Sequence, residues 1–353
     1  MSIDTGGLFE MIPHMVFFLS MGVFWVIVAV MGALSGVAEA GPFTSKTSQG
    51  DLSRRVVDRP LVMPKGWLEV ATAVDSKTSQ AYRGSDGGLR EQPKGMSWNH
   101  ARLWLEVRQG FSDRVTLYGR VPWVRSSLRP AGGNEITTLA MGDAHTGLVV
   151  QPMLGGPGSF AVSLDLKAPS GVEWPSGSGG PANTSSFLTG TGATNLSVLG
   201  HAKWAIKGMA SMAAELGYVR KFPAIVGYVV AQEGFGNGVI NPGDEWILNT
   251  DITAMAGSMV SLAGQLNFRR MGESSVGING SEGRQMSALR HTGGDWVDVG
   301  LSLSVEPSAH WGVELSASQD LKGGDTRTFA HLGLEELAPQ PGRRFGTKVV
   351  ARW

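Results

Sequence analysis

Apolar and polar residues alternate along two successive runs between residues 101 and 124. In the first run, Leu103, Leu105 and Val107 alternate with charged residues and a tryptophan, and the second run repeats the pattern after a predicted turn at residues 110–113. Side chains of a β-strand point to opposite faces with a period of two, so each run has one apolar and one mostly charged face. Runs of about ten residues let tilted strands cross a bilayer. The segment therefore predicts a β-hairpin, although strands of a soluble sandwich alternate in the same way.

The alternation recurs along the chain, and its spacing favours one class of fold. The runs cover residues 67–74, 102–108, 114–123, 141–150, 160–168, 195–204, 212–219, 245–252, 262–269, 297–305, 311–318, 327–335 and 346–353. The predicted long loops cover residues 75–98, 126–139, 169–191, 221–244 and 271–294. Long loops that alternate with short turns are typical of bacterial outer-membrane barrels, whereas a sandwich would scatter its loop lengths. We expect an all-β, antiparallel, up-and-down transmembrane β-barrel with short periplasmic turns and long extracellular loops.

The runs give thirteen candidate strands, but outer-membrane barrels of bacteria have an even number. We expect about twelve strands, with the surplus candidate between residues 327 and 353. The last run places Val349, Ala351 and Trp353 on one face. This ending resembles the C-terminal signal by which outer-membrane barrels are recognised for assembly. The expected partners are therefore the barrel-assembly machinery, outer-membrane lipid and a small-molecule solute.

Tryptophans lie at or near the ends of the predicted strands. An interfacial girdle would place them there, although soluble folds also have tryptophan at strand ends. The residues are Trp67, Trp98, Trp123, Trp246, Trp296, Trp311 and Trp353.

The composition narrows the function without naming it. The chain has 353 residues, no cysteine and 30 basic against 30 acidic residues, so no strongly charged partner is implied and nucleic acid is not expected. The lack of cysteine excludes disulfides, thiolate metal sites and cysteine nucleophiles. After residue 40 no apolar run approaches the roughly 18 residues of a spanning helix, so the mature chain must insert by strands.

The N-terminal region predicts export. Residues 15–34 form a long apolar block, and Ala38-Glu39-Ala40 fits the small-x-small cleavage rule, so we interpret residues 1–40 as a signal peptide. This region has no Lys or Arg, which departs from a signal peptide with a basic n-region and is consistent with a start at Met11 or Met15. The alternative is an uncleaved single-span anchor.

A polar segment separates the signal peptide from the first predicted strand. Residues 41–64 have no clear period and are interpreted as a mobile leader that could plug the lumen, or as a disordered periplasmic tail. The barrel is expected over residues 65–353.

Four phrases carry a resemblance to a known family. They are Arg120-Val121-Pro122-Trp123-Val124, Met141-Gly142-Asp143, residues 164–171 (LDLKAPSG) and residues 189–194 (TGTGAT). Together they make residues 60–337 resemble the outer-membrane transporters associated with the phenol meta-cleavage degradation pathway; the extension beyond Leu337 departs from that family's usual ending. The resemblance implies passage of small, often aromatic or apolar, compounds.

If the apolar faces contact lipid, the opposite faces line the interior. The predicted lumen-lining residues are Arg102, Glu106, Arg108, Arg120, Asp143, Asp165, Lys167, His201, Lys203, Glu245, Asp251, Arg269, Asp298 and Glu314. Charges of both signs would pair and brace a narrow barrel, or form the polar wall of a wider channel.

An enzyme would need a nucleophile and a base brought together. His145, His201 and His331 lie on presumed inward faces and serines are plentiful, but no spacing points to a catalytic site. No metal or cofactor is expected, because His-rich spacing and calcium-loop clustering are missing, and Gly190-Thr191-Gly192 has no lysine in the place a phosphate loop needs.

The sequence therefore predicts a non-enzymatic outer-membrane channel for passive uptake of small molecules. Two alternatives remain open: a structural or surface-interaction barrel that transports nothing, and an outer-membrane hydrolase.

Overall fold

A computed structural model describes the barrel and the segment that leads into it. The described residues are 52–53, 55–79, 81–83, 88–92, 96–129, 135–152, 158–170, 193–206, 209–231, 234–280, 283–289, 293–323 and 341–353. The predicted signal peptide, residues 41–51 of the leader, and the candidate strand at 327–335 lie outside them. None of the helices in the described ranges is long and apolar enough to cross a membrane.

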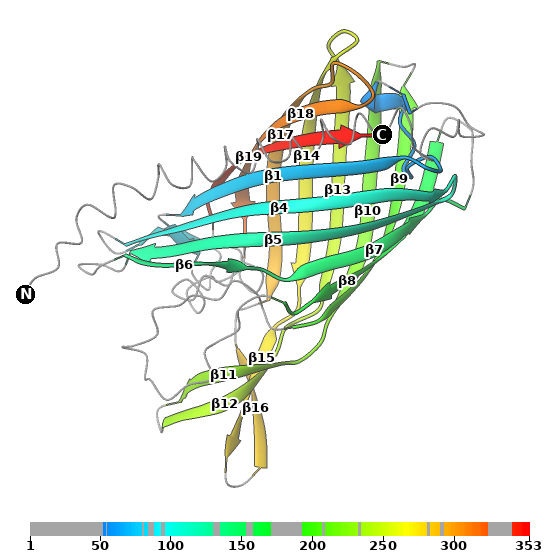
Figure 1. Cartoon of the computed structure of the whole chain (residues 1–353). Coiled ribbons are helices and arrows are strands. Elements are labelled where there is room, and N and C mark those ends of the chain that lie inside the picture. The colour runs from blue at the N-terminus through cyan, green and yellow to red at the C-terminus, as the bar shows by residue number, and fades with distance from the viewer. Residues whose placement is uncertain are drawn as a thin grey trace, which may run out of the picture. The chain divides into compact units, whose positions relative to one another are not determined.

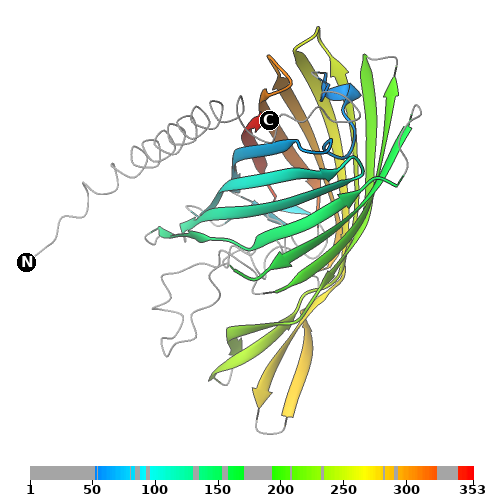
Figure 2. The ribbon, with the colours of Figure 1, turned by 45° about the vertical axis from the view of Figure 1, so that its right-hand side comes forward.

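Twelve antiparallel strands close into a barrel, as the sequence predicted (Figures 1 and 2). They are β1 (Leu68–Ser79), β4 (Ser97–Ser112), β5 (Val115–Arg129), β7 (Ala144–Val150), β8 (Gly158–Ala168), β9 (Asn195–Ile206), β10 (Ala210–Lys221), β13 (Glu245–Met255), β14 (Val260–Met271), β17 (Gly294–Val305), β18 (Trp311–Lys322) and β19 (Arg343–Arg352). Each pairs with the next in this order, and β1 also pairs with β19, which closes the wall. Because β18 pairs directly with β19, the wall closes without residues 327–335.

One wall position is shared by two short strands. β6 (Ile136–Met141) pairs with residues 123–128 of β5, and β7 pairs with residues 115–120 of the same strand. The break between them falls at Gly142-Asp143, where Gly142 N donates to Pro122 O at 2.8 Å. The pairing of β6 with β5 corrects the predicted loop at residues 126–139.

Three other predicted loops also contain strands. A four-stranded sheet contains β11 (Ala224–Ala231), β12 (Gly234–Asn241), β15 (Ser274–Gly280) and β16 (Gly283–Leu289), and a small hairpin contains β2 (Ala81–Arg83) and β3 (Leu89–Glu91). The glycines of these segments had indicated loops, but a neighbouring strand satisfies their backbone, and β11, β12 and β15 also carry β-branched residues. The loop prediction was wrong there because pairing outweighed local composition.

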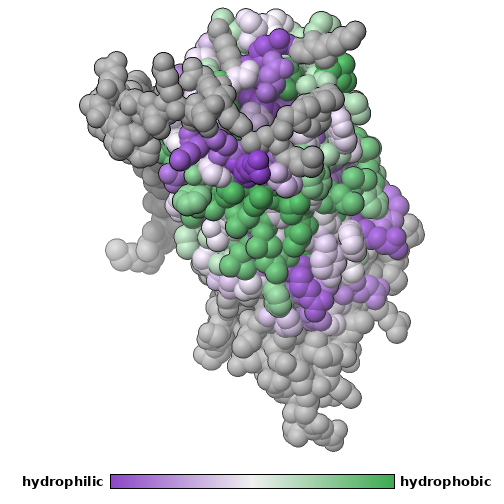
Figure 3. All heavy atoms as spheres, turned by 90° about the vertical axis from the view of Figure 1, so that its right-hand side faces the viewer, coloured by the Kyte–Doolittle hydropathy of each residue, from purple (hydrophilic) through white to green (hydrophobic). Residues whose placement is uncertain are grey.

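The outer face of the barrel wall is apolar and the inner face is polar, as contact with lipid outside and water inside requires. On β8, Phe160, Val162, Leu164 and Leu166 are exposed, while Ala161, Ser163, Asp165 and Lys167 between them are buried. The same alternation on the other strands produces the band of hydrophobic side chains between hydrophilic rims in Figure 3. An outward apolar band with a polar interior is the arrangement of a transmembrane barrel.

The tryptophans divide between the two faces. Trp123, Trp246 and Trp311 are exposed, as a girdle requires, but Trp67, Trp98 and Trp296 are buried. The girdle prediction was therefore wrong for the buried three, since a position near a strand end does not fix the face.

The chain enters the barrel at the end that carries the short turns, here called the short-turn end; the opposite end is the long-loop end. Residues 52–67 include the 3₁₀ turn η2 (Val56–Asp58) and the buried apolar cluster of Leu52, Met63 and Trp67. Gly110 lets this segment approach the wall, because a Cβ there would lie 2.0 Å from Pro64 O. Gly66, at φ 85°, turns the chain into β1 and donates its N–H to Gly110 O at 2.9 Å.

An arginine at the middle of the outward face should be costly. We expect Leu266→Arg on β14 to destabilise the folded barrel in lipid vesicles by about 2–4 kcal/mol, because a guanidinium there enters hydrocarbon. The measurement is the free energy of unfolding by urea titration. Gln265→Arg, one residue away on the inward face, is the control and should cost much less. Equal losses would contradict the assignment of the faces.

Candidate functional site

The candidate site is the polar interior of the barrel. All fourteen residues predicted to line the lumen lie on the wall face opposite the exposed apolar side chains, Asp143 at the break between β6 and β7 and the others within strands. They do not form one cluster. Register and hydrogen bonds divide them into a charged row at the short-turn end and smaller groups along the wall.

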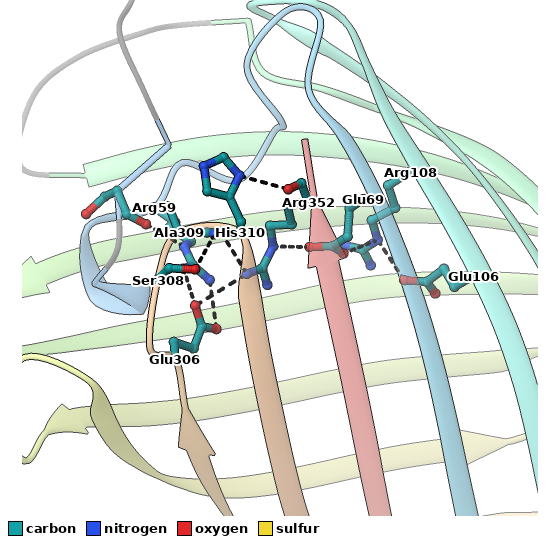
Figure 4. Close-up of polar contacts among 10 residues, drawn as sticks. Arg59, Glu69, Glu106, Arg108, Glu306, Ser308, Ala309, His310 and Arg352 are labelled. Atoms are coloured by element: carbon teal, nitrogen blue, oxygen red, sulfur yellow. Dashed lines mark hydrogen bonds and ion pairs between the residues drawn. The ribbon is translucent and has the colours of Figure 1, made fainter. Parts of the chain in front are cut away.

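The charged row consists of residues of alternating sign from the leader and four parts of the wall (Figure 4). In spatial order its members are Arg59, Glu306, Arg352, Glu69, Arg108 and Glu106. Only the last two had been predicted. Every neighbour is of opposite charge, so each carboxylate is held between or beside arginines, which is what buried ionic groups require.

The centre of the charged row joins the last strand to the first. Arg352 Nε donates to Glu69 Oε2 at 2.6 Å, and Arg352 Nη1 donates to Glu306 Oε2 at 3.3 Å. All three side chains are buried. His310 Nδ1 lies 2.9 Å from Arg352 O, and the His310 ring stacks on Trp67 with centroids 5.4 Å apart. Arg352 is therefore fixed from both its side chain and its backbone.

The leader is attached to the wall by polar contacts. Arg59 makes a paired hydrogen bond with Glu306, one of its two contacts being Nη1 to Oε1 at 2.8 Å. Lys203 Nζ donates to Val56 O and Arg59 O, each at 2.9 Å. Met63 N donates to Thr116 Oγ1 at 2.7 Å. Since Lys203 and Thr116 are inward-facing wall residues, this part of the leader lies on the inner side of the wall.

A cavity of about 210 Å³ lies between the leader and the wall. The leader contributes Arg59 and residues 60–63 to its lining, and the wall contributes Glu69, Arg108 and Tyr118 among others. The cavity therefore has an apolar side on the leader and a charged side on the wall.

Farther along the wall, the predicted residues pair mostly with near neighbours. Tyr118 Oη donates to Asp165 Oδ2 at 2.9 Å and His145 Nδ1 lies 3.1 Å from Asp165 Oδ1. Lys167 Nζ is 3.1 Å from Asp143 Oδ2, and both side chains are only 2% exposed. These pairs are satisfied within the wall, which favours a bracing role for them.

The remaining predicted residues each have a neighbour in the wall. Arg120 and Arg102 lie over the Trp104 ring at 4.9 and 5.5 Å, and Arg102 Nε is 3.3 Å from Asp75. Their other contacts are Arg269 with Glu245 (3.7 Å), Asp298 with Asn267 (2.6 Å) and Asp251 with Thr253 (3.3 Å), and Glu314 is opposite Lys348 in the register.

Several members of this interior had no predicted role. Arg59 lies in a segment without alternation, so no periodic signal could have found it. Glu306 directly follows the run 297–305 and continues its inward positions, so extending that run by one residue could have found it. Arg352 could have been found, because it lies between Ala351 and Trp353, which the last run places on one face; Glu69 lies between Leu68 and Val70 in the run 67–74, so the same period could have found it. In the described part of the chain, no three His, Asp or Glu residues form a group that could hold a metal ion.

A histidine, a serine and a carboxylate meet in the described wall at His201. Ser163 Oγ lies 2.8 Å from His201 Nε2, and His201 Nδ1 lies 3.1 Å from Glu215 Oε2. Asn249 Nδ2 donates to the other oxygen of Glu215 at 2.8 Å. His145 instead faces Asp165 and Tyr118, and His331 lies outside the described residues.

Comparison with known proteins gives the fold. No protein-family model matches the sequence, and neither does any curated protein. An outer membrane channel from Pseudomonas putida F1 is similar in structure, with 13% identity, a TM-score of 0.62, and 83% of this chain and 97% of that chain covered. The NanC porin (8% identity, TM-score 0.43, 80% and 98% covered) and a deletion mutant of the TodX monoaromatic hydrocarbon channel (11%, 0.44, 82% and 90%) are more distant. The first of these similarities shows that this chain has the β-barrel fold of that channel.

Arg352 is the residue whose loss should weaken the barrel most. We expect Arg352→Gln to lower the free energy of unfolding by on the order of 3 kcal/mol, because Glu69 and Glu306 would both lose a buried cationic partner. The measurement is urea unfolding, together with the temperature at which the folded band is lost on a gel.

The control is Arg114→Gln in the exposed β4–β5 turn at the same end, where we expect about 0–1 kcal/mol. If Arg352→Gln lowered the free energy of unfolding no more than this control does, the charged row would not stabilise the pairing of β1 with β19.

Proposed function

We propose that the protein is a bacterial outer-membrane channel for passive uptake of small molecules. The observation that carries the proposal is a closed wall with an apolar outer band and an interior of alternating charges. Charges of both signs keep an interior hydrated without making it selective for one sign of ion. On this proposal the short turns face the periplasm, and the terminal segment that ends at Trp353 is read by the assembly machinery.

The resemblance to transporters of the phenol meta-cleavage pathway suggests the class of solute. Small aromatic or apolar compounds would need an aromatic surface within the polar interior. Trp104 contributes aromatic carbon to such a surface, and Arg102 and Arg120, whose guanidinium groups lie over its ring, can contact polar substituents of a planar solute.

The leader acts in this proposal as a partial plug. Residues 55–63 are held on the inner side of the wall at the short-turn end by Glu306, Lys203 and Thr116. A segment attached by a few polar contacts can narrow the opening and still be displaced. Arg59 is the anchor whose side chain joins the leader to the charged row.

Single-channel conductance in a planar bilayer tests the channel and the plug together. We expect the protein that begins at Gly41 to conduct, and deletion of residues 41–64 to raise its conductance several-fold. Arg59→Gln should give more frequent transitions to the larger conductance, because the paired contact with Glu306 is lost.

Lys65→Gln is the control, since Lys65 is exposed and contacts the wall through its backbone N–H. Heat-dependent gel mobility establishes that each variant is folded. Silence of both the full and the shortened protein would contradict the channel and favour a structural or surface-interaction barrel.

Hydrolysis is a second candidate function, favoured by one observation. Ser163, His201 and Glu215 have the order of contacts of a serine–histidine–carboxylate triad. Two features weigh against it: Ser163 is 3% exposed, and its strand is paired on both sides, so the strand backbone offers no free N–H groups to stabilise an oxyanion.

Covalent labelling decides this candidate. A fluorophosphonate probe should modify Ser163 in the folded protein if the triad acts, and His201→Ala should abolish the modification. Mass spectrometry of the labelled peptide is the measurement, with Ser211→Ala, another buried inward-facing serine, as control. No adduct at Ser163 would eliminate the hydrolase.

A further inference from the structure

Basic side chains on the outer face of the wall are confined to the long-loop end. Among the described outward positions of the barrel strands they are Arg125, Arg129, Arg220, Arg270, Lys322 and Arg343. At the short-turn end the described outward positions carry no charge and include Trp204, Ile252 and Trp311. The two boundaries of the apolar band therefore differ in chemistry.

Three of these cations lie on alternate strands of the wall, β10, β14 and β18, at the long-loop end of the apolar band. Arg220 and Arg270 are the second-last residues of β10 and β14, and Lys322 ends β18. An open pocket of about 450 Å³ contains Arg220 and Arg270, with Tyr218 and Trp246 between them. The two aromatic rings are 5.0 Å apart between centroids and inclined at 54°.

Asp244 orients Arg220 at this pocket. Its Oδ2 accepts hydrogen bonds from Arg220 Nη1 and Tyr218 Oη, both at 2.5 Å, and its Oδ1 accepts one from Lys221 N at 3.0 Å. Partial burial opposes ionisation, but these hydrogen bonds lower the pKa of the Asp244 carboxyl group below its ordinary value. Arg220 is therefore held by a carboxylate that stays ionised, while its side chain remains more than half exposed.

Arg270 and Lys322 share the acidic neighbour Asp295. Asp295 Oδ1 lies 3.9 Å from Arg270 Nε, and its Oδ2 lies 3.4 Å from Lys322 Nζ. Both cations are largely exposed, Arg270 at 73% and Lys322 at 61% of the side chain. Both cations therefore direct donor groups away from the wall, beside a pocket that Asp244 and Glu273 also line.

We propose that Arg220, Arg270 and Lys322, together with Tyr218 and Trp246, bind the phosphate-bearing headgroup of a glycolipid in the outer leaflet. Guanidinium groups bind phosphate through paired hydrogen bonds, and an aromatic pair at a membrane interface presents apolar faces beside them. The pocket is larger than one phosphate group needs, which favours a sugar-linked headgroup. The proposal rests on the outer-membrane orientation proposed above and is independent of transport.

Native mass spectrometry of the folded protein in detergent, titrated with bisphosphorylated lipid A, tests this site. We expect the wild type to hold the lipid, and Arg220→Gln/Arg270→Gln to bind it at least about tenfold more weakly, since each charge-assisted hydrogen bond is worth about a factor of ten. Arg114→Gln, an exposed arginine at the short-turn end, should bind as the wild type does. Arg270→Gln/Lys322→Gln leaves the Asp244 contacts intact and decides the matter if the first double variant does not fold.

Dephosphorylated lipid A and phosphatidylglycerol identify the recognised group, and both should bind weakly to the wild type. Equal binding of either lipid would overturn the assignment to a phosphorylated glycolipid. Displacement by inorganic phosphate at equal concentration would overturn it in favour of free phosphate. Unchanged binding in the folded double variants would overturn the site itself. The conductance of these variants should equal that of the wild type, so failure of this proposal is distinguishable from failure of the channel.

Discussion

The pairing of the first strand with the last is the constraint on which the rest of the barrel depends. Within lipid, an unpaired backbone N–H or C=O costs several kcal/mol, so a sheet that crosses a membrane must close. Here β1 and β19 pair from Glu69 opposite Arg352 to Thr78 opposite Arg343. The ion pair of Glu69 with Arg352 lies at one end of this seam, and a shift of one residue would turn the Arg352 guanidinium toward lipid. The ion pair therefore favours one register at the joint where the chain itself imposes none.

Arg352 also connects the closure of the barrel to the leader, because it shares the Glu306 carboxylate with Arg59. Glu306 contacts Arg352 on the wall and Arg59 on the leader, so its carboxylate is shared between the seam and the segment inside the barrel. Without Arg59, Arg352 alone would neutralise Glu306. Without Arg352, the leader would be attached to a carboxylate that has lost its arginine partner on the wall. Stability at the short-turn end and the position of the leader are thus coupled through a single side chain.

The architecture was predictable because its signal is local. A period of two in each run assigns strands and faces, and short turns between long loops indicate a barrel, which the closed wall of twelve strands confirms. The charged row was not predictable in the same way. Arg352 and Glu69 are 283 residues apart and meet only because the barrel closes, and Arg59 lies in a segment without alternation. The strands β11, β12, β15 and β16 were missed because glycines indicate loops locally, whereas pairing with a neighbouring strand is decided elsewhere in the chain.

The balanced net charge of the chain combines two differently arranged sets of charged residues, one inside the barrel and one on its outer face. Inside the barrel, acids and bases alternate and mostly neutralise one another at short range. On the outer face, the cations at the long-loop end exceed the nearby acids, and the described strand positions at the short-turn end are uncharged. A total of 30 basic and 30 acidic residues implied no strongly charged partner, but a total says nothing about distribution. A barrel separates its two faces by the thickness of one sheet, so a neutral chain can still present a basic rim to an anionic surface.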